Sequence, residues 1–111
     1  MKTIIMTVGT SLLTNPDRDL TEKRPWVGQK SIGDRAKAID WMNQTALELI
    51  SAETNTLWRL DPYPDDAVLL LHSDTPQGLE CAEVLKMFFG EALNQKIVNL
   101  HKLPGINYLS V

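Results

Sequence analysis

Two short polar loops, each containing glycine and hydroxyl side chains, follow two apolar segments of the sequence. Gly9-Thr10-Ser11 comes directly after residues 3–8, and Ser73-Asp74-Thr75-Pro76-Gln77-Gly78 comes directly after residues 67–72. Backbone amides and a helix N-terminus can hold phosphate without any positive side chain. Both loops therefore have the chemistry of an anion site, in which the Ser11 hydroxyl can donate to a phosphoryl oxygen.

Each loop also has a purely structural explanation. Glycine gives a turn its backbone freedom, and Ser or Thr caps the next helical turn. Thr75 is the predicted N-cap of a helix whose first residue is Pro76. Asp74 would repel a phosphate placed directly on it, so we expect it to bond a ribose hydroxyl or neighbouring backbone. The first loop lacks the patterns of the usual NAD and ATP sites, G-x-G-x-x-G and G-K-[ST].

Three apolar segments predict the strands that carry these loops. Residues 3–8 are β-branched and apolar, which is typical of a strand covered on both faces. Residues 67–72 and 96–101 are the second and third strands. The charged clusters Asp17–Arg24 and Asp61–Asp66 are expected to be solvated, and the two prolines of the second cluster end the preceding helical segment.

Apolar residues at helical spacing predict the helices between the strands. The first helix begins at Ser31–Asp34, which has the form of a capping box, after a long irregular, lid-like connection over residues 12–33. Its apolar face consists of Ala36, Ile39, Met42, Ala46, Leu47 and Ile50, and a restarted turn at residues 51–54 brings Leu57 and Leu60 inward. The second helix buries Leu79, Ala82, Val84, Leu85, Phe88, Phe89 and Leu93.

The alternation of strand and helix predicts an α/β fold with an open, mainly parallel, Rossmann-like sheet and flanking helices. So small a sheet has exposed edges. We therefore expect a single domain over residues 1–111 that forms a homodimer or is the N-terminal part of a longer domain.

Composition narrows the class of protein. The chain has 111 residues, 43% of them hydrophobic, and a formal net charge of −3, which makes long nucleic acids unsuitable partners.

The single Cys81 rules out an internal disulfide and is expected to be a buried, inert thiol. We expect no metal and no cofactor. The sequence has neither a signal-peptide pattern nor a membrane-length apolar run, which predicts a soluble, cytoplasmic protein.

Two histidines and two tryptophans are weaker candidates. His72 and His101 lie at the ends of predicted strands, where one of them could act as a general base. A structural or surface role is the alternative for both. Trp26 and Trp41 could stack an adenine, with surface packing as their alternative.

Four segments resemble, in their order and spacing, the CRISPR-associated Rossmann-fold family. They are Met6–Leu13 (MTVGTSLL), Ser51–Leu57 (SAETNTL), Leu71–Gly78 (LHSDTPQG) and Cys81–Leu85 (CAEVL). Members of this family bind cyclic oligoadenylates, the second messengers of type III CRISPR systems, across a two-fold dimer interface. Some carry a fused ribonuclease, and others are stand-alone ring nucleases that cut the messenger.

The resemblance implies a ligand site and a reaction. Gly9, Thr10 and Ser11 would contact the ligand, and Ser73, Asp74, Thr75 and Gly78 would form the neighbouring wall. A ring nuclease would use metal-independent transesterification, in which a ribose 2′-hydroxyl attacks the adjacent phosphorus and leaves a 2′,3′-cyclic phosphate. Ser11 is the candidate catalytic residue, because its hydroxyl would stabilise charge on the phosphorane.

The family also supplies a Lys or Arg from a later part of its domain, and this sequence has no obvious counterpart after Lys102. Basic groups from elsewhere are the alternative, such as Lys23, Arg24, Lys30 or Arg35. The Arg-to-His pattern of the fused ribonuclease is also missing. Three hypotheses remain: a cyclic-oligoadenylate-binding ring nuclease, a non-catalytic sensor module that regulates a partner, and a structural fragment.

Overall fold

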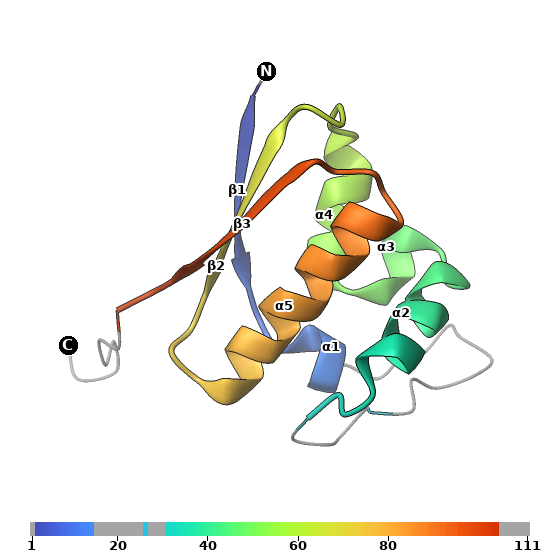
Figure 1. The fold of residues 1–111 in the computed structure, drawn as a ribbon, viewed down its shortest axis with the longest axis vertical. Helices are drawn as coiled ribbons and strands as arrows, with labels where there is room; N and C mark the ends of the chain where they lie inside the picture. The colour runs from blue at the N-terminus through green and yellow to red at the C-terminus, as the bar shows by residue number, and fades with distance from the viewer. Residues whose placement is uncertain (1, 15–25, 27–30, 105–111) are drawn as a thin grey trace.

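The computed structural model describes residues 2–14, 26 and 31–104, which form three strands and five helices (Figure 1). The strands are β1 (Thr3–Val8), β2 (Ala67–His72) and β3 (Ile97–Lys102). The helices are α1 (Ser11–Thr14), α2 (Arg35–Asn43), α3 (Leu47–Ile50), α4 (Ala52–Leu60) and α5 (Pro76–Glu91).

The strands form one parallel sheet in the order β1-β2-β3, which confirms the predicted α/β fold. The register pairs Val8 with His72 and His72 with Lys102. All three strands therefore end at the same edge of the sheet, which is the edge where open parallel sheets bind ligands.

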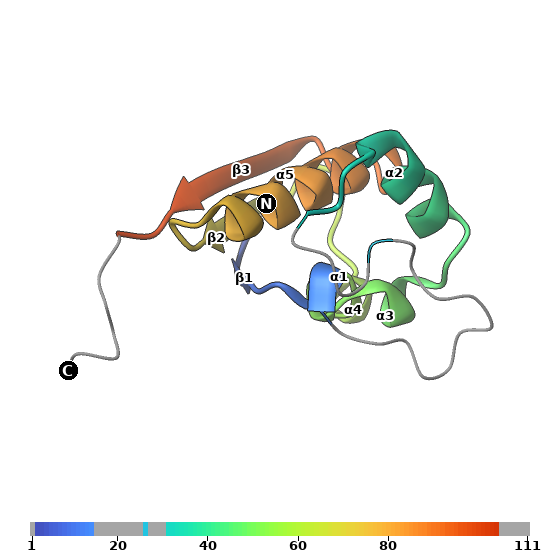
Figure 2. The same cartoon turned by 90° about the horizontal axis from the view of Figure 1, so that it is seen from below.

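One face of the sheet is covered and the other is open. The described helices all lie on the same side of the strands (Figure 2). Burial alternates along β1, so that Ile4, Met6 and Val8 face the core while Ile5 is 63% exposed. The prediction that residues 3–8 are covered on both faces is wrong. Successive crossovers of one hand, advancing in one direction across the sheet, place their helices on a single face.

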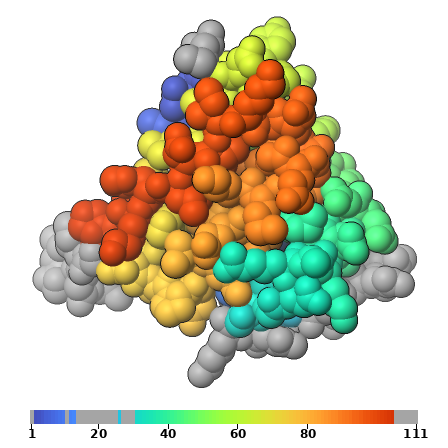
Figure 3. Space-filling view, in the orientation of Figure 1, coloured from blue at the N-terminus to red at the C-terminus, as the bar shows by residue number. Residues whose placement is uncertain are grey.

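Helix α5 is the centre of the core and packs against all three strands and α2. Figure 3 shows β3 and α5 side by side across one face of the molecule, with α2 next to α5. The predicted apolar face is confirmed for Ala82, Val84, Leu85, Phe88 and Phe89, which are all buried. Leu79 is exposed instead, and Leu93 lies beyond the helix and is only partly buried. No helix in the described ranges is long and apolar enough to cross a membrane.

Cys81 lies on the buried face of α5, as predicted. Its burial, together with the negative charges of Glu53 and Glu80, raises the pKa of the thiol to about 12. The thiolate is the nucleophilic form of cysteine, so this side chain is inert near neutral pH.

The first helix begins near the predicted start, but with a different cap. Asp34 is its N-cap, and its carboxylate accepts hydrogen bonds from the amides of Ala36 and Lys37. Ser31, the expected cap, instead donates to Glu80 on α5 and accepts from the Gly33 amide. Ser31 therefore holds the segment that precedes α2 against α5 and does not cap the helix.

The continuous helix predicted to reach residue 50 is interrupted between α2 and α3. The Thr45 hydroxyl donates to the Trp41 carbonyl at 2.7 Å. This side-chain bond occupies a backbone acceptor of the last turn of α2 and so competes with continuation of the helix. The helix restarts at α4, where Ser51 and Thr54 form a capping box. Leu57 is buried as predicted, but Leu60 is exposed at the end of the helix.

Trp26 is a core residue and not a surface side chain. Its indole nitrogen donates to the Leu12 carbonyl at 2.6 Å, and its ring meets Trp41 edge to face at 5.5 Å between centroids. Neither ring is therefore presented openly for adenine stacking. Residues 15–25 and 27–30 of the expected lid lie outside the described residues. Residues 12–14, where an irregular segment was predicted, belong to α1.

Asp66 is buried, which corrects the prediction of solvated charge at this position. It precedes β2, and its carboxylate accepts hydrogen bonds from the amides of Lys2 and Tyr63, each at 2.9 Å. The bond from Lys2 is the main reason why the pKa of Asp66 lies below its ordinary value. This side chain fixes the starts of β1 and β2 together.

We expect Asp66 to make the protein less stable in acid. A lowered pKa in the folded state gives stability above the ordinary carboxyl pKa, and this stability is lost as the pH falls through the folded-state value. Asp66→Asn should lower the urea midpoint at neutral pH. Below about pH 4, the midpoint of the variant should fall less steeply with decreasing pH than that of the wild type. Asp65→Asn, which removes an exposed partner of Lys96, is the control and should change neither. Equal urea curves for the wild type and Asp66→Asn across the pH range would contradict this role.

Neighbouring isoleucines test the one-sided sheet. Ile4 is buried and Ile5 is exposed, although both lie in β1. Ile4→Ala is expected to lower the free energy of unfolding by about 2–4 kcal/mol, and Ile5→Ala by less than about 1 kcal/mol. Urea denaturation at two protein concentrations measures both. A large cost for Ile5→Ala would mean that another surface covers the open face in solution.

Candidate functional site

The two loops identified in the sequence lie next to each other at the carboxyl edge of the sheet. Val8 pairs with His72, so Gly9 and Ser73 start their loops from adjacent strands. This adjacency agrees with the neighbouring positions that the family resemblance implies for the two loops. The chemistry available in each loop differs from the expectation, however.

The first loop is held by a carboxylate from α4. The Gly9 amide donates to Glu53 Oε1 at 2.8 Å, and Glu53 is only 5% exposed. The capping box at Ser51 and Thr54 sets the first turn of α4, which includes Glu53. An amide expected to receive a ligand anion is therefore bonded to an anion of the protein itself.

Thr10 and Ser11 continue this loop into α1. The Thr10 carbonyl accepts from the Leu13 amide at 2.8 Å, and Ser11 is the first residue of the helix. The Ser11 hydroxyl, on which the predicted catalytic role depends, lies outside the described part of the structure.

The second loop is the predicted helix cap. The Thr75 hydroxyl accepts from the Gly78 amide at 3.0 Å and lies 2.8 Å from the Ser73 hydroxyl, with Pro76 as the first helical residue. Gly78 is buried, and a Cβ added there would collide with the Ser73 side chain. Its amide is used inside the loop, while Ser73, Asp74 and Thr75 are exposed.

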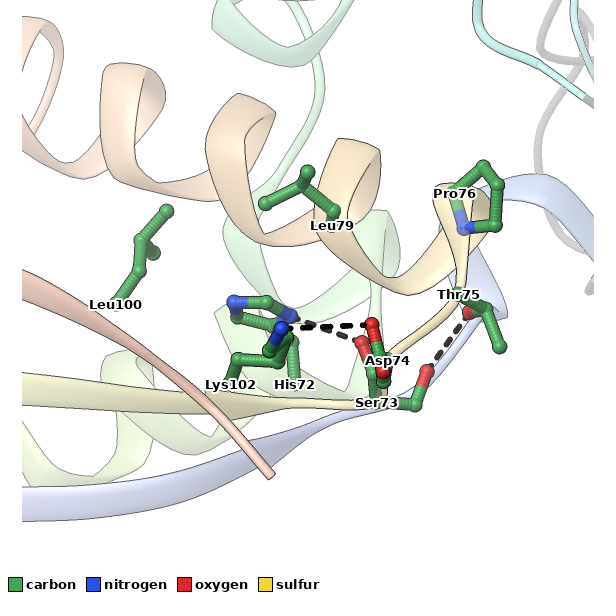
Figure 4. Close-up of a pocket in the computed structure, with 8 residues that line it drawn as sticks. All are labelled: His72, Ser73, Asp74, Thr75, Pro76, Leu79, Leu100 and Lys102. Carbon is green, nitrogen blue, oxygen red and sulfur yellow. Dashed lines mark hydrogen bonds and ion pairs between the residues drawn. The ribbon is translucent and has the colours of Figure 1, made fainter. Parts of the chain in front are cut away.

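A cavity of about 570 Å³ opens beside the second loop (Figure 4). It lies between the carboxyl ends of β2 and β3 and the first turn of α5. Its lining consists of His72, Ser73, Asp74, Thr75, Pro76, Leu79, Leu100 and Lys102. None of these residues belongs to the first loop. Three of the predicted ligand contacts, Ser73, Asp74 and Thr75, thus gather at one cavity.

Lys102 supplies the positive charge of this cavity. It is the last residue of β3 and pairs with His72 in the register, and its Nζ lies 3.8 Å from Asp74 Oδ1. Lys102 was not among the basic candidates predicted from the sequence, because the resemblance implies a basic group from a later part of the domain. The signal that could have found Lys102 is the predicted end of the third strand, because parallel strand ends meet at one edge.

The other basic candidates do not add to the cavity in the described part of the chain. Arg35 pairs with Glu83 on α5 at 3.0 Å. Lys23, Arg24 and Lys30 lie outside the described residues.

The two histidines have different surroundings. His72 is 4% exposed and lines the cavity, and its Nδ1 lies 2.9 Å from the Ser73 carbonyl oxygen. His101 is exposed and pairs with Leu71 in the register. Only His72 is therefore placed to act on a molecule in the cavity.

Within the described residues, no three His, Cys, Asp or Glu side chains gather as a metal site would require. No family model matches the sequence, and no curated protein matches it.

Proposed function

We propose that this chain binds a cyclic oligoadenylate at the carboxyl edge of its sheet, as a CRISPR-associated Rossmann-fold domain acting as a homodimer. The observation that supports this most directly is the meeting of three strand ends, which places both polar loops and Lys102 at one edge. The resemblance of four sequence segments to that family supplies the identity of the ligand.

The cavity has groups suited to one nucleotide unit of a cyclic oligoadenylate, in which each phosphodiester carries one negative charge. Its lining contains one carboxylate, Asp74, and one ammonium, Lys102, so the charged side chains sum to zero. A phosphodiester carries a single negative charge, which Lys102 can compensate. Leu79 and Leu100 offer apolar surface to a base or sugar, and Ser73 and Thr75 offer hydroxyls.

The second candidate is a sensor module that binds the same ligand without cutting it. One observation favours it. The Gly9 amide, which ring cleavage would use to stabilise developing charge on the phosphorane, is already bonded to Glu53. Incubation of the protein with labelled cyclic tetraadenylate in EDTA separates the two candidates. Linear products ending in 2′,3′-cyclic phosphate would identify a metal-independent ring nuclease, and an intact ring beside tight binding would identify the sensor.

Lys102 gives a mutational test of the site. Lys102→Gln is expected to weaken binding of cyclic tetraadenylate about tenfold, because a charge-assisted contact to phosphate is lost. Lys96→Gln is a matched control, since both side chains are 63% exposed and pair with an aspartate, Asp65 in the case of Lys96. Lys96 precedes β3 and lies at the opposite edge of the sheet. Isothermal titration calorimetry measures the two affinities, and equal losses in both variants would indicate only a nonspecific effect of charge.

The binding proposal fails if calorimetry detects no interaction with cyclic tri-, tetra- or hexaadenylate. Sedimentation equilibrium with and without ligand tests the homodimer separately. If the protein binds ligand but stays monomeric, the homodimer part of the proposal is wrong and the proposed binding site still stands.

A further inference from the structure

His72 presents a hydrogen-bonding atom to the cavity that the protein itself leaves unused. The residue is 4% exposed, and its Nδ1 lies 2.9 Å from the Ser73 carbonyl oxygen. Among the residues that the structure describes, none is hydrogen-bonded to Nε2. Figure 4 shows this second nitrogen turned away from Ser73, on the side of the ring where Leu100 lies. Buried polar atoms normally have a partner.

The contact with Ser73 determines what Nε2 can do. A carbonyl oxygen only accepts hydrogen bonds, so Nδ1 must carry the proton that it donates. In the uncharged ring, Nε2 then holds a lone pair and acts as an acceptor. A molecule in the cavity pairs with this acceptor only through a donor group, which the ionised oxygens of a phosphodiester lack.

We propose that His72 Nε2 accepts a hydrogen bond from a ribose 2′-hydroxyl and thereby makes the site selective for ribonucleotides over deoxyribonucleotides. This inference rests on the proposed binding of an oligonucleotide ring. It adds to that function the group of the ligand that is recognised, the ribose 2′-hydroxyl, and the residue that recognises it, His72.

The position of Lys102 favours a hydroxyl over the adenine amino group as the donor. Lys102 and His72 are register partners on neighbouring strands, and such strands lie about 4.8 Å apart. A phosphate on Lys102 therefore places its own ribose near His72. The 2′-hydroxyl is on the carbon next to the one that bears the phosphate, whereas the amino group is at the far side of the base.

Calorimetry with three rings tests the proposal on the wild-type protein: cyclic tetraadenylate, its all-2′-deoxy counterpart and the inosine counterpart, which lacks the amino group. We expect the deoxy ring to bind at least about tenfold more weakly than the ribose ring, because Nε2 is then left without a donor. The inosine ring should bind like cyclic tetraadenylate. Equal affinity for the ribose and deoxy rings, or a loss confined to the inosine ring, would overturn the proposal.

Two variants assign the effect to His72. His72→Phe keeps a ring of similar size without an acceptor, and it should bind the ribose and deoxy rings equally. His72→Gln keeps an oxygen acceptor and should retain part of the preference. Circular dichroism checks the fold of both. A preference that persists in His72→Phe would exclude His72 while leaving the proposed function in place, whereas a wild-type protein that binds none of the rings would refute the proposed function itself.

Discussion

Gly78→Ala is expected to destabilise the protein by about 1–3 kcal/mol, the usual cost of forcing an extra carbon into a packed site. A Cβ at this position would collide with the Ser73 side chain and would lie 3.0 Å from the Thr75 hydroxyl and 3.2 Å from the Ser73 carbonyl oxygen. The carbonyl is backbone and cannot rotate away by itself. The loop after β2 must therefore move to accept the new carbon.

Gly90 provides a matched control in the same helix. A Cβ there would meet only the Gln95 carbonyl oxygen, at an ordinary contact distance of 3.9 Å. Gly90→Ala should stabilise the protein by about 0.5–1 kcal/mol, since alanine is the better helix former. The two substitutions are thus expected to have opposite signs in urea denaturation.

A double substitution locates the cause of the Gly78 effect. Ser73→Ala removes the hydroxyl that the new Cβ would meet but leaves the Ser73 carbonyl in place. The pair Ser73→Ala and Gly78→Ala should therefore cost less than the sum of the single changes. Additive costs would place the strain at the backbone alone, and a stabilising Gly78→Ala would show that the loop is not packed in this way.

The parts of the fold that local sequence determines were predicted well. β2 begins and ends where the apolar run does, and Thr75 caps α5 with Pro76 in its first turn. Both signals lie within a few residues of the structure that they specify. The adjacency of the two loops follows from the predicted parallel sheet, because parallel strands that follow one another across a sheet end at one edge.

The contacts that hold the first loop and the starts of the strands join distant parts of the chain. The Gly9 amide and Glu53 are separated by 44 residues, and the Lys2 amide and Asp66 by 64. Neither carboxylate differs in sequence pattern from a solvated surface charge. The open face of the sheet was missed because the apolar Ile5 lies on it, between Thr3 and Thr7, so that an alternating strand has the appearance of a continuous apolar run.

Glu53 is expected to oppose the binding of an anionic ligand at the first loop. Its carboxylate is nearly buried beside the first loop and accepts from the Gly9 amide at 2.8 Å. A negative charge held there opposes any anion that approaches the same loop, and such repulsion is strong in poorly solvated surroundings. Glu53→Gln removes the charge but keeps an oxygen that can accept from Gly9. We expect it to bind cyclic tetraadenylate about tenfold more tightly, the equivalent of roughly 1.4 kcal/mol.

Glu53→Ala distinguishes the effect of the negative charge of Glu53 from the effect of its hydrogen bond on the position of the first loop. It removes the same charge and also the acceptor of the Gly9 amide, which should cost about 1.5–3 kcal/mol of stability and leave the first loop without its anchor. If the carboxylate acts only as a repelling charge, both variants will bind more tightly in calorimetry. If it also holds the loop in its binding geometry, the glutamine variant will gain affinity and the alanine variant will lose it. We expect the second pattern, because an amide that has lost its fixed acceptor must be ordered again by the ligand. Unchanged affinity in both variants would place the ligand at the second loop alone, beyond the reach of Glu53.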